Sequence, residues 1–337
     1  MKVYLPIFAK SEDKSYLSLV NEQEDLLFLQ SLLDKKVEID IGADVPQKPE
    51  YEILVTGRPT REYLTASDKL HTLIIPFAGL PETTREMLYE FPGIKVHNLH
   101  FNADETAEMA VSLLMASAKH LIPIDRSFRQ HEWGQRYENP SSSILLFGKS
   151  ALVLGYGEIG QRIAKICSAL GMSVRVIKRT LDMKPGACAS IEIHPITELA
   201  KLLPSAEVLV IALPLTAETE GLLGKSELDL LPKDSILVNI GRGKIVDEEA
   251  LYQTLKTGKI RAGLDVWYNY PRDNNDMTKT PPSRFPFHEL ENVVMSPHRG
   301  GHSQEMTKRR MTALADLLNL AALGKLLPNA IDVRRGY

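Results

Sequence analysis

The chain has 337 residues, of which 44% are hydrophobic and 25% are charged, and its formal net charge is -3. This length exceeds that of a usual single-core domain, and the near-neutral charge gives no reason to expect binding to nucleic acid or to an anionic membrane. No apolar stretch approaches the roughly 20 residues that a membrane span requires, so we expect no membrane anchor. These features predict a globular, two-domain protein whose partners are small molecules.

Cysteine and histidine spacing bears on compartment and metal binding. The two cysteines, Cys167 and Cys188, are too few for a secreted disulfide framework and do not have metal-ligand spacing. His298 and His302 stand four residues apart, a spacing that binds metal on a helix, but the two glycines between them disfavour a regular helix. We therefore expect a cytoplasmic protein without a metal site.

Short apolar runs alternate with amphipathic segments along the first hundred residues. We expect strands at 3–8, 37–41, 53–55, 73–75 and 95–97, and helices at 22–33 and 82–90. This alternation is typical of a parallel sheet covered by helices. Pro6 interrupts the first apolar run, which fits a buried strand better than a signal peptide.

A longer amphipathic segment follows at residues 104–121. Its apolar residues recur at helical spacing and predict one helix that connects the two domains. The expected buried stripe consists of Ala107, Ala110, Val111, Leu114 and Met115.

From Ile144 onward the pattern begins again as a strand, a glycine turn, a helix and a strand. Further strands are expected at 173–177, 208–212, 236–240 and 263–266. The loop at 268–288 is rich in Pro, Asn and Asp, and its length suggests a lid or a contact surface. A last helix at 304–323 is expected to pack back onto the N-terminal domain.

A glycine motif of the form GxGxxG is made by Gly155, Gly157 and Gly160, between an apolar strand and a helix over 158–170. Gly155 allows a tight turn, Gly157 admits a pyrophosphate, and Gly160 lets the helix approach the strand. The helix N-terminus adds amide donors for phosphate. The alternative is a structural glycine turn, but the flanking strand and helix favour a dinucleotide site.

The strand at 173–177 ends in Lys178, Arg179 and Thr180, where an NAD site normally has an acidic residue for the ribose 2′-hydroxyl. Two cations there suit the 2′-phosphate of NADP, although a solvated basic turn is the alternative. We expect NADP or NAD as cofactor, with NADP preferred.

Several motifs resemble those of the D-2-hydroxyacid dehydrogenase family, which includes glyoxylate and hydroxypyruvate reductases and NAD-dependent formate dehydrogenases. Besides the glycine loop, they lie at 146–149, 213–216, 239–243, 246–251, 263–267 and 296–298, with looser matches at 77–79 and 107–110. The resemblance implies an α/β protein and a homodimer formed through the nucleotide domain. A Rossmann-type doubly wound parallel sheet domain, residues 102–298, would be inserted into a smaller flavodoxin-like α/β substrate domain, residues 1–101 plus 299–337.

The resemblance also implies catalytic roles. Arg242 would clamp the substrate carboxylate with its planar guanidinium, and His298 would be the general acid/base during hydride transfer. A surface arginine and a structural histidine are the alternatives. Backbone amides at Ala78 and Gly79 would contact the carboxylate, unless they form an ordinary strand-end turn. Asn102 would contact substrate, as in the formate branch, or cap a helix.

Cofactor contacts are implied in the same way. Asp265 would contact the nicotinamide carboxamide, and Thr216 and Ile240 would line the cofactor channel. Further contacts are expected at Glu158, Ile159, Leu213, Pro214, Thr219, Gly241 and Gly300.

One position departs from the family pattern. Five residues after Asp265 the dehydrogenases have a glutamate that pairs with the histidine, and the formate branch has a glutamine, whereas this chain has Tyr270. A neutral phenol cannot stabilise imidazolium as a carboxylate does, so we predict a lower pKa for His298 than in the usual histidine–glutamate dyad and count Tyr270 with the catalytic residues. Glu289 and Glu291 precede His298 closely enough in sequence to be substitutes.

The sequence therefore predicts an NAD(P)-dependent dehydrogenase or reductase acting on a small 2-keto or 2-hydroxy acid. The first alternative is a formate-like dehydrogenase. Asn102 and the absence of the family's glutamate favour it, whereas the absence of the formate branch's glutamine argues against it. The second is a nucleotide-sensing, partner-binding protein with little turnover, similar to the C-terminal binding corepressors. The lost glutamate favours it, whereas the retained Arg242 and His298 argue against it.

Overall fold

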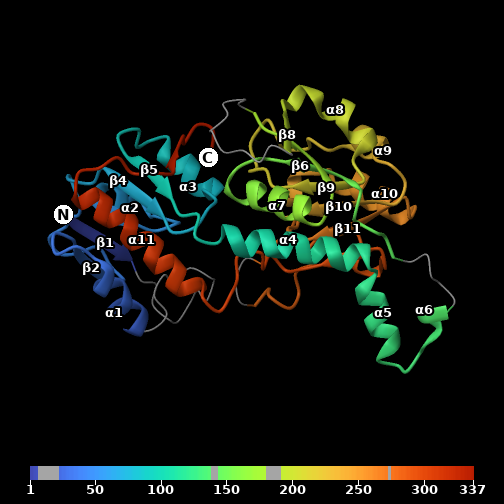
Figure 1. The fold of residues 1–337 in the computed structure, drawn as a ribbon. Helices are drawn as coiled ribbons and strands as arrows, with labels where there is room; N and C mark the ends of the chain where they lie inside the picture. The colour runs from blue at the N-terminus through green and yellow to red at the C-terminus, as the bar shows by residue number, and fades with distance from the viewer. Residues whose placement is uncertain (7–22, 138–142, 180–190, 272–274) are drawn as a thin grey trace. The chain divides into compact units, whose positions relative to one another are not determined.

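The computed structural model describes residues 1–6, 23–137, 143–179, 191–271 and 275–337, which form two compact units (Figure 1). Unit 1 comprises Met1–Asn102, Pro271–Lys279 and Ser303–Tyr337, and unit 2 comprises Ala103–Tyr270 and Thr280–His302. Unit 2 is thus an insertion in the sequence of unit 1. The expected boundaries differ from these by one residue at Asn102 and four at His302, and Pro271–Lys279 clusters with unit 1 rather than with its sequence neighbours.

Unit 1 contains a six-stranded sheet in the order β13-β5-β4-β3-β1-β2. Its strands are β1 (Lys2–Pro6), β2 (Glu38–Gly42), β3 (Ile53–Val55), β4 (Thr72–Ile75), β5 (Lys95–Asn98) and β13 (Ala330–Ile331). All neighbours pair in parallel except β13, which runs antiparallel to β5. The order β2-β1-β3-β4-β5 is that of the flavodoxin-like doubly wound fold.

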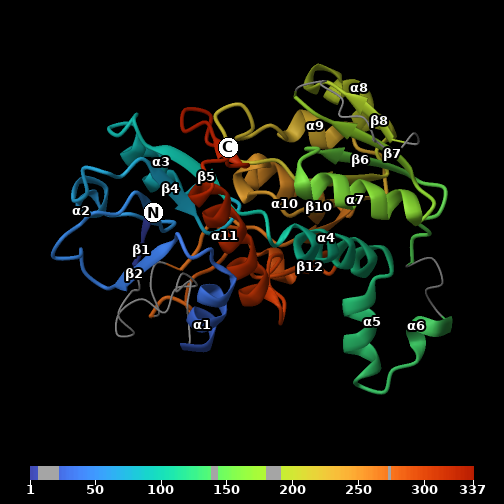
Figure 2. The same ribbon diagram turned by 60° about the vertical axis from the view of Figure 1, so that its left-hand side comes forward.

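Helices cover both faces of this sheet. They are α1 (Gln23–Leu32), α2 (Arg61–Thr65), α3 (Glu82–Leu88) and α11 (Met306–Ala322). Helices α1 and α11 lie side by side (Figures 1 and 2), and Leu29, Met311 and Leu314 share one core with strand residues such as Val3 and Ile53. The prediction that the last helix packs onto the N-terminal domain is therefore confirmed.

Unit 2 contains a seven-stranded sheet in the order β12-β11-β10-β9-β6-β7-β8, with every neighbouring pair parallel. Its strands are β6 (Ser150–Leu154), β7 (Ser173–Ile177), β8 (Ile191–His194), β9 (Val208–Ile211), β10 (Ser235–Asn239), β11 (Ile260–Leu264) and β12 (Val293–Met295). The strand order reverses between β6 and β9, as in the Rossmann fold.

The β6 sequence shows why this sheet is covered on both faces. Side chains alternate along a strand, so Leu152 and Leu154 enter one hydrophobic core while Ala151 and Val153 enter the other. Helices α4 and α7 cover one face, and α8 to α10 cover the other. The helices are α4 (Ala103–Ala118), α5 (Leu121–Phe128), α6 (Gly134–Tyr137), α7 (Glu158–Ala169), α8 (Leu199–Leu202), α9 (Lys225–Leu230) and α10 (Glu248–Lys256).

The single helix expected over 104–121 is wrong at its C-terminal end. The chain breaks at His120, which has a left-handed φ of 52°, and α5 then bends by 64° from α4. The expected stripe is also shifted, because Met115 is 36% exposed while Leu113 is buried. Leu113 faces the sheet closely, since a Cβ at Gly263 of β11 would lie 2.7 Å from that of Leu113.

Residues 121–137, which we call the α5–α6 arm, extend from the body of unit 2 in both views (Figures 1 and 2). Helix α5 has no buried residue, and Ile122 and Phe128 are exposed, with Phe128 packed edge-on against Trp133. In the described part of the chain, no single helix is long and apolar enough to cross a membrane. Helices α4 and α5 meet that criterion only as a bent pair.

Candidate active site

The expected site residues of unit 2 lie at one edge of its sheet. Because the strands are parallel, their carboxyl ends meet there, at the place where open α/β sheets bind ligands. The segments that follow six of the strands begin at Gly155, Lys178, Ala212, Ile240, Asp265 and Ser296.

The glycine loop joins β6 to α7 through two close backbone approaches. Gly155 has a φ of 98°, and a Cβ there would lie 2.6 Å from the Ala212 carbonyl oxygen. A Cβ at Gly160 would lie 2.0 Å from the Gly155 carbonyl oxygen. Gly157, the N-cap of α7, has no protein atom within 4 Å of the corresponding point. This loop leaves open space beside a helix N-terminus, which fits a phosphate group.

The first residues of α7 leave that N-terminus accessible. The exposed Glu158 pairs with Arg162, one helical turn further on, at 2.8 Å. Ile159, the next residue, is partly buried against the core under α7.

The basic turn follows β7. The Lys178 backbone N–H donates to the His194 carbonyl oxygen at 3.0 Å, and Arg179 is exposed. Thr180 lies outside the described residues, as does Cys188. The His194 side chain, which the sequence did not single out, contacts Glu198 at 2.9 Å.

The loops after β9 and β10 pack backbone against backbone. The Thr219 hydroxyl donates to the Pro214 carbonyl oxygen and accepts from the Thr216 N–H. A Cβ at Gly241 would lie 2.6 Å from the Leu213 carbonyl oxygen. Ile240 is 6% exposed and belongs to the hydrophobic core, so only a small part of its side chain can reach a ligand.

Arg242 is held by its own loop. Asn239 donates through its side-chain amide to the Arg242 carbonyl oxygen at 3.0 Å and accepts from the Gly241 N–H at 3.0 Å. The Arg242 guanidinium donates to the Gly241 carbonyl oxygen at 2.7 Å. Burial lowers the pKa of Arg242, and Tyr270 partly opposes that shift. Among the residues that the structure describes, no carboxylate pairs with this guanidinium.

Asp265 anchors the loop that carries His298. Its buried carboxylate accepts hydrogen bonds from the Ser296 hydroxyl at 2.6 Å and from the N–H groups of Arg299 and Gly300 at 2.8 Å each. His298 has a left-handed φ of 58°, which is costly for a residue with a side chain and persists where surrounding contacts enforce it. The sequence indicated a cofactor contact for Asp265 but not this anchoring role.

Tyr270 lies beside His298, with ring centroids 5.5 Å apart, and its hydroxyl accepts from the Trp267 N–H at 3.0 Å. Partial loss of hydration raises the pKa of Tyr270, which is still 43% exposed, so its phenol is neutral at pH 7. Loss of hydration and the Arg242 charge lower the pKa of His298 from 6.5, while Asp265 opposes the shift. This direction agrees with the prediction.

Neither glutamate proposed as a substitute acts on His298. Glu289 is exposed with its nearest histidine, His288, at 4.0 Å, and the Glu291 charge raises the pKa of a different histidine, His120. The carboxylate that raises the pKa of His298 is Asp265. The part of the chain that the structure describes contains no cluster of three or more side chains that could hold a metal ion.

The remaining expected residues belong to unit 1. Ala78 and Gly79 follow the carboxyl end of β4, and the Ala78 carbonyl oxygen accepts from the side-chain amide of Asn98 at 2.6 Å. Asn98, at the end of β5, was not indicated by the sequence. Asn102 is the last residue of unit 1 and directly precedes α4.

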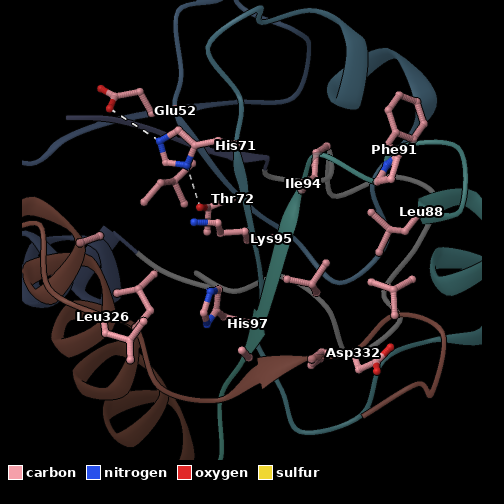
Figure 3. Close-up of a pocket in the computed structure, with 18 of the residues that line it drawn as sticks. Glu52, His71, Thr72, Leu88, Phe91, Ile94, Lys95, His97, Leu326 and Asp332 are labelled. Carbon is pink, nitrogen blue, oxygen red and sulfur yellow. Dashed lines mark hydrogen bonds and ion pairs between the residues drawn. The ribbon is translucent and has the colours of Figure 1, made fainter.

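A cavity of about 1280 Å³ lies at the opposite end of the unit 1 strands, where β4 and β5 begin (Figure 3). His71, Lys95 and His97 line it together with the acidic Glu52. His71 contacts the Thr72 hydroxyl at 2.8 Å, and His97 contacts the Pro328 carbonyl oxygen at 2.8 Å. None of the expected site residues lines this cavity.

Comparison with known proteins relates this arrangement to one family. Residues 111–300 match the model for the NAD binding domain of D-isomer specific 2-hydroxyacid dehydrogenases. The glyoxylate reductase of Aeropyrum pernix is 31% identical over 323 residues, which cover 89% of this chain and 91% of that protein. The D-3-phosphoglycerate dehydrogenase of Methanocaldococcus jannaschii is 28% identical over 275 residues, 81% of this chain but 50% of the longer relative.

A solved structure is similar over the whole chain. It is a D-isomer specific 2-hydroxyacid dehydrogenase from Xanthobacter autotrophicus in complex with NADPH and MES, with a TM-score of 0.78 and 22% identity. The alignment covers 100% of this chain and 99% of that one. With the glycine loop, the strand order and the matched domain, the chain belongs to the D-isomer specific 2-hydroxyacid dehydrogenase family.

Proposed function

We propose that the protein is an NAD(P)-dependent oxidoreductase that interconverts a small 2-keto acid and the corresponding 2-hydroxy acid. The observation that carries the proposal is the Arg242 guanidinium, which is partly buried at the same sheet edge as His298 and has no carboxylate partner in the described chain. A buried charge without a partner is costly. A substrate carboxylate supplies the missing partner.

The proposed chemistry needs two groups of this chain at the substrate. The planar Arg242 guanidinium binds the carboxylate through two parallel N–H donors and so fixes the neighbouring carbonyl. His298 donates a proton to the carbonyl oxygen as C2 gains a hydride, and it accepts that proton in the oxidative direction. A dinucleotide bound at the glycine loop supplies or accepts the hydride.

The residues that would hold this cofactor fit it. Gly155, Gly157 and Gly160 form a cradle that side chains would fill, and the α7 N-terminus offers amide donors to the pyrophosphate. Lys178 and Arg179 suit a 2′-phosphate, and the similar Xanthobacter protein was solved with NADPH, so we keep the preference for NADP.

The backbone at Ala78 and Gly79 and the side chain of Asn102 remain proposed substrate contacts on unit 1. We also propose a cytoplasmic location and a homodimer. The exposed apolar residues of the α5–α6 arm support the homodimer.

A nucleotide-binding protein with little turnover is the second candidate. It is favoured by one observation, namely that Tyr270 packs beside His298 where a paired carboxylate would hold the imidazolium. A formate-like activity has less support, because Tyr270 replaces the glutamine of that branch as well.

Optical assays of NADPH and NADH oxidation distinguish these functions. The substrates are glyoxylate, hydroxypyruvate, pyruvate and bulkier 2-keto acids, and the reverse assay uses formate with NADP or NAD. We expect turnover with at least one 2-keto acid and none with formate. Tight dinucleotide binding without turnover on the whole panel would contradict the proposal and favour the second candidate.

A further inference from the structure

We propose that Trp267 is a positioning residue that holds Arg242, Tyr270 and His298 in one arrangement. The inference rests on the proposed function, because it concerns the residues to which that function assigns the chemistry. Trp267 stands two residues after Asp265, at the carboxyl end of β11, and is 5% exposed. The backbone N–H, the indole N–H and the backbone carbonyl of Trp267 contact three segments, which we call the three loops: those that carry Tyr270, His298 and Arg242 respectively.

The backbone N–H of Trp267 fixes Tyr270. It donates to the Tyr270 hydroxyl at 3.0 Å, and the Tyr270 ring in turn lies against the His298 imidazole. The phenol oxygen is therefore held within its own turn.

The indole N–H of Trp267 fixes the segment that leads to His298. Nε1 donates to the Ser296 carbonyl oxygen at 2.8 Å. Ser296 also donates its backbone N–H to Leu264 and its hydroxyl to Asp265. The indole bond is thus the contact that orients the Ser296–Pro297 peptide plane, two residues before the left-handed His298.

The carbonyl of Trp267 fixes the Arg242 loop. A Cβ at Gly243, directly after Arg242, would lie 2.3 Å from this carbonyl oxygen. The two backbones are therefore in contact, and only glycine fits at the second position. The position of Arg242 follows that of Trp267 through this contact.

The indole ring itself is set by the hydrophobic core. It packs edge-on against Phe287 with centroids 5.9 Å apart. Trp267 thereby connects the hydrophobic core to the segments that carry Arg242, Tyr270 and His298, in addition to the bonds that Asp265 makes to the His298 loop. Misplacing a reacting group by about 1 Å can lower a rate about 100-fold, so this connection matters for catalysis.

The test is Trp267→Phe, which keeps an apolar ring and removes the indole N–H donor. We expect kcat to fall about 10- to 100-fold, the range of a small misplacement of a reacting group. The KM for the 2-keto acid and the Kd for the dinucleotide should stay within about twofold of the wild-type values, because the loops still form. The NMR signals of His298 should shift, and so should its titration midpoint.

The neighbouring residue offers a matched control. Tyr268 donates its hydroxyl to the Val246 carbonyl oxygen at 3.0 Å, so Tyr268→Phe also removes one hydrogen bond from an aromatic side chain to the backbone, but not one to the segment that leads to His298. Tyr268→Phe should leave kcat and the His298 signals unchanged. If both variants lose thermal stability equally and neither alters kcat or the His298 signals, Trp267 is only structural and the proposal is overturned.

Two further outcomes remain informative. If Trp267→Phe does not fold, the tryptophan analogue benzothienylalanine, in which sulfur replaces the indole N–H, is incorporated at position 267. The Trp133→Phe background restricts the analogue to this position, because the chain has only two tryptophans. We expect the same changes in kcat and in the His298 signals. If wild type turns over no substrate, the proposed function fails, and the His298 signals alone decide about Trp267. A shift in the Trp267 variant but not in Tyr268→Phe supports the positioning role, and equal signals reject it.

Discussion

His298 works beside a phenol rather than a carboxylate. The sequence predicted a lower pKa than in the usual dyad because Tyr270 cannot stabilise imidazolium. The direction agrees with this prediction, but its causes are the loss of hydration and the positive charge of Arg242, and the charge of Asp265 only partly compensates. At neutral pH His298 is therefore mostly unprotonated, ready to accept a proton rather than to donate one.

This environment predicts the pH dependence of the two directions. Oxidation needs neutral imidazole, so its kcat/KM should rise as pH increases through the lowered pKa of His298 and stay level above 6.5. Reduction needs imidazolium, so its kcat/KM should fall over the same window. Tyr270→Glu should raise the pKa by about 1 to 3 units and extend reduction to higher pH. Tyr270→Gln is the neutral control, and an equal shift in both variants would contradict a charge effect.

The residues of the site could be predicted where they belong to a motif, but their hydrogen-bond partners could not. Gly155, Gly160 and Arg242 stand in recognisable patterns. Trp267 and the anchoring role of Asp265 depend on which atoms face each other after β11 and β12 have paired, and a sequence pattern does not contain that geometry. Long-range contacts of this kind decide where His298 lies.

At the scale of elements, buried apolar strands and the helices α1, α3, α7 and α11 were predicted because their hydrophobic period is clear, whereas the amphipathic α10 was not predicted. The strands β8 and β12 were missed although β3 is equally short and was predicted, because β3 is wholly buried and reads as an apolar run, whereas β8 and β12 are each only partly buried. The break after α4 was missed for another reason. Apolar residues continue into α5, but there they face outward from unit 2 instead of marking a buried stripe.

The glycine loop allows a test that separates folding from binding. Gly160→Ala should lower thermal stability and dinucleotide affinity together, because its Cβ would collide with the Gly155 backbone. Gly157→Ala meets only open space, so it should keep the melting temperature and still weaken dinucleotide binding about 10-fold or more by crowding the phosphate. Calorimetry of binding and thermal unfolding measures both. Unchanged affinity in Gly157→Ala would show that no phosphate approaches this loop.

The basic turn after β7 determines the expected cofactor preference. Replacing Lys178 and Arg179 with serine should weaken NADPH binding about 10- to 100-fold, the scale of one or two charge-assisted hydrogen bonds, and change NADH binding much less. Lys165→Ser, at an exposed position of α7, is the control for a simple loss of charge. Equal weakening of both cofactors would mean that the turn is only a solvated basic surface.

At the scale of the whole molecule, the sequence predicted two α/β units with one inserted into the other. That followed from a pattern that restarts near Ile144 and from a last helix with an apolar side. The antiparallel β13, which adds to the edge of the unit 1 sheet next to β5, was not predicted, because two residues carry no strand signal.

The α5–α6 arm predicts how two copies assemble. Its exposed Ile122 and Phe128 resemble the apolar centre of a protein interface. We expect wild type at twice the mass of one chain in analytical ultracentrifugation and the double variant Ile122→Glu, Phe128→Glu as a monomer. Leu230→Glu, which charges an exposed leucine of α9, should stay dimeric. A monomeric wild type, or a dimeric double variant, would exclude the arm as the interface.

The most direct test of the account compares Arg242→Met and His298→Gln in steady-state reduction of the best 2-keto acid. We predict that Arg242→Met mainly raises KM, about 10- to 100-fold, because a charged hydrogen-bonding partner of the carboxylate is lost. His298→Gln should mainly lower kcat, about 100- to 10,000-fold, because proton transfer is lost. Both variants should bind the dinucleotide as wild type does. Wild-type kcat in His298→Gln, or wild-type KM in Arg242→Met, would contradict the assigned roles.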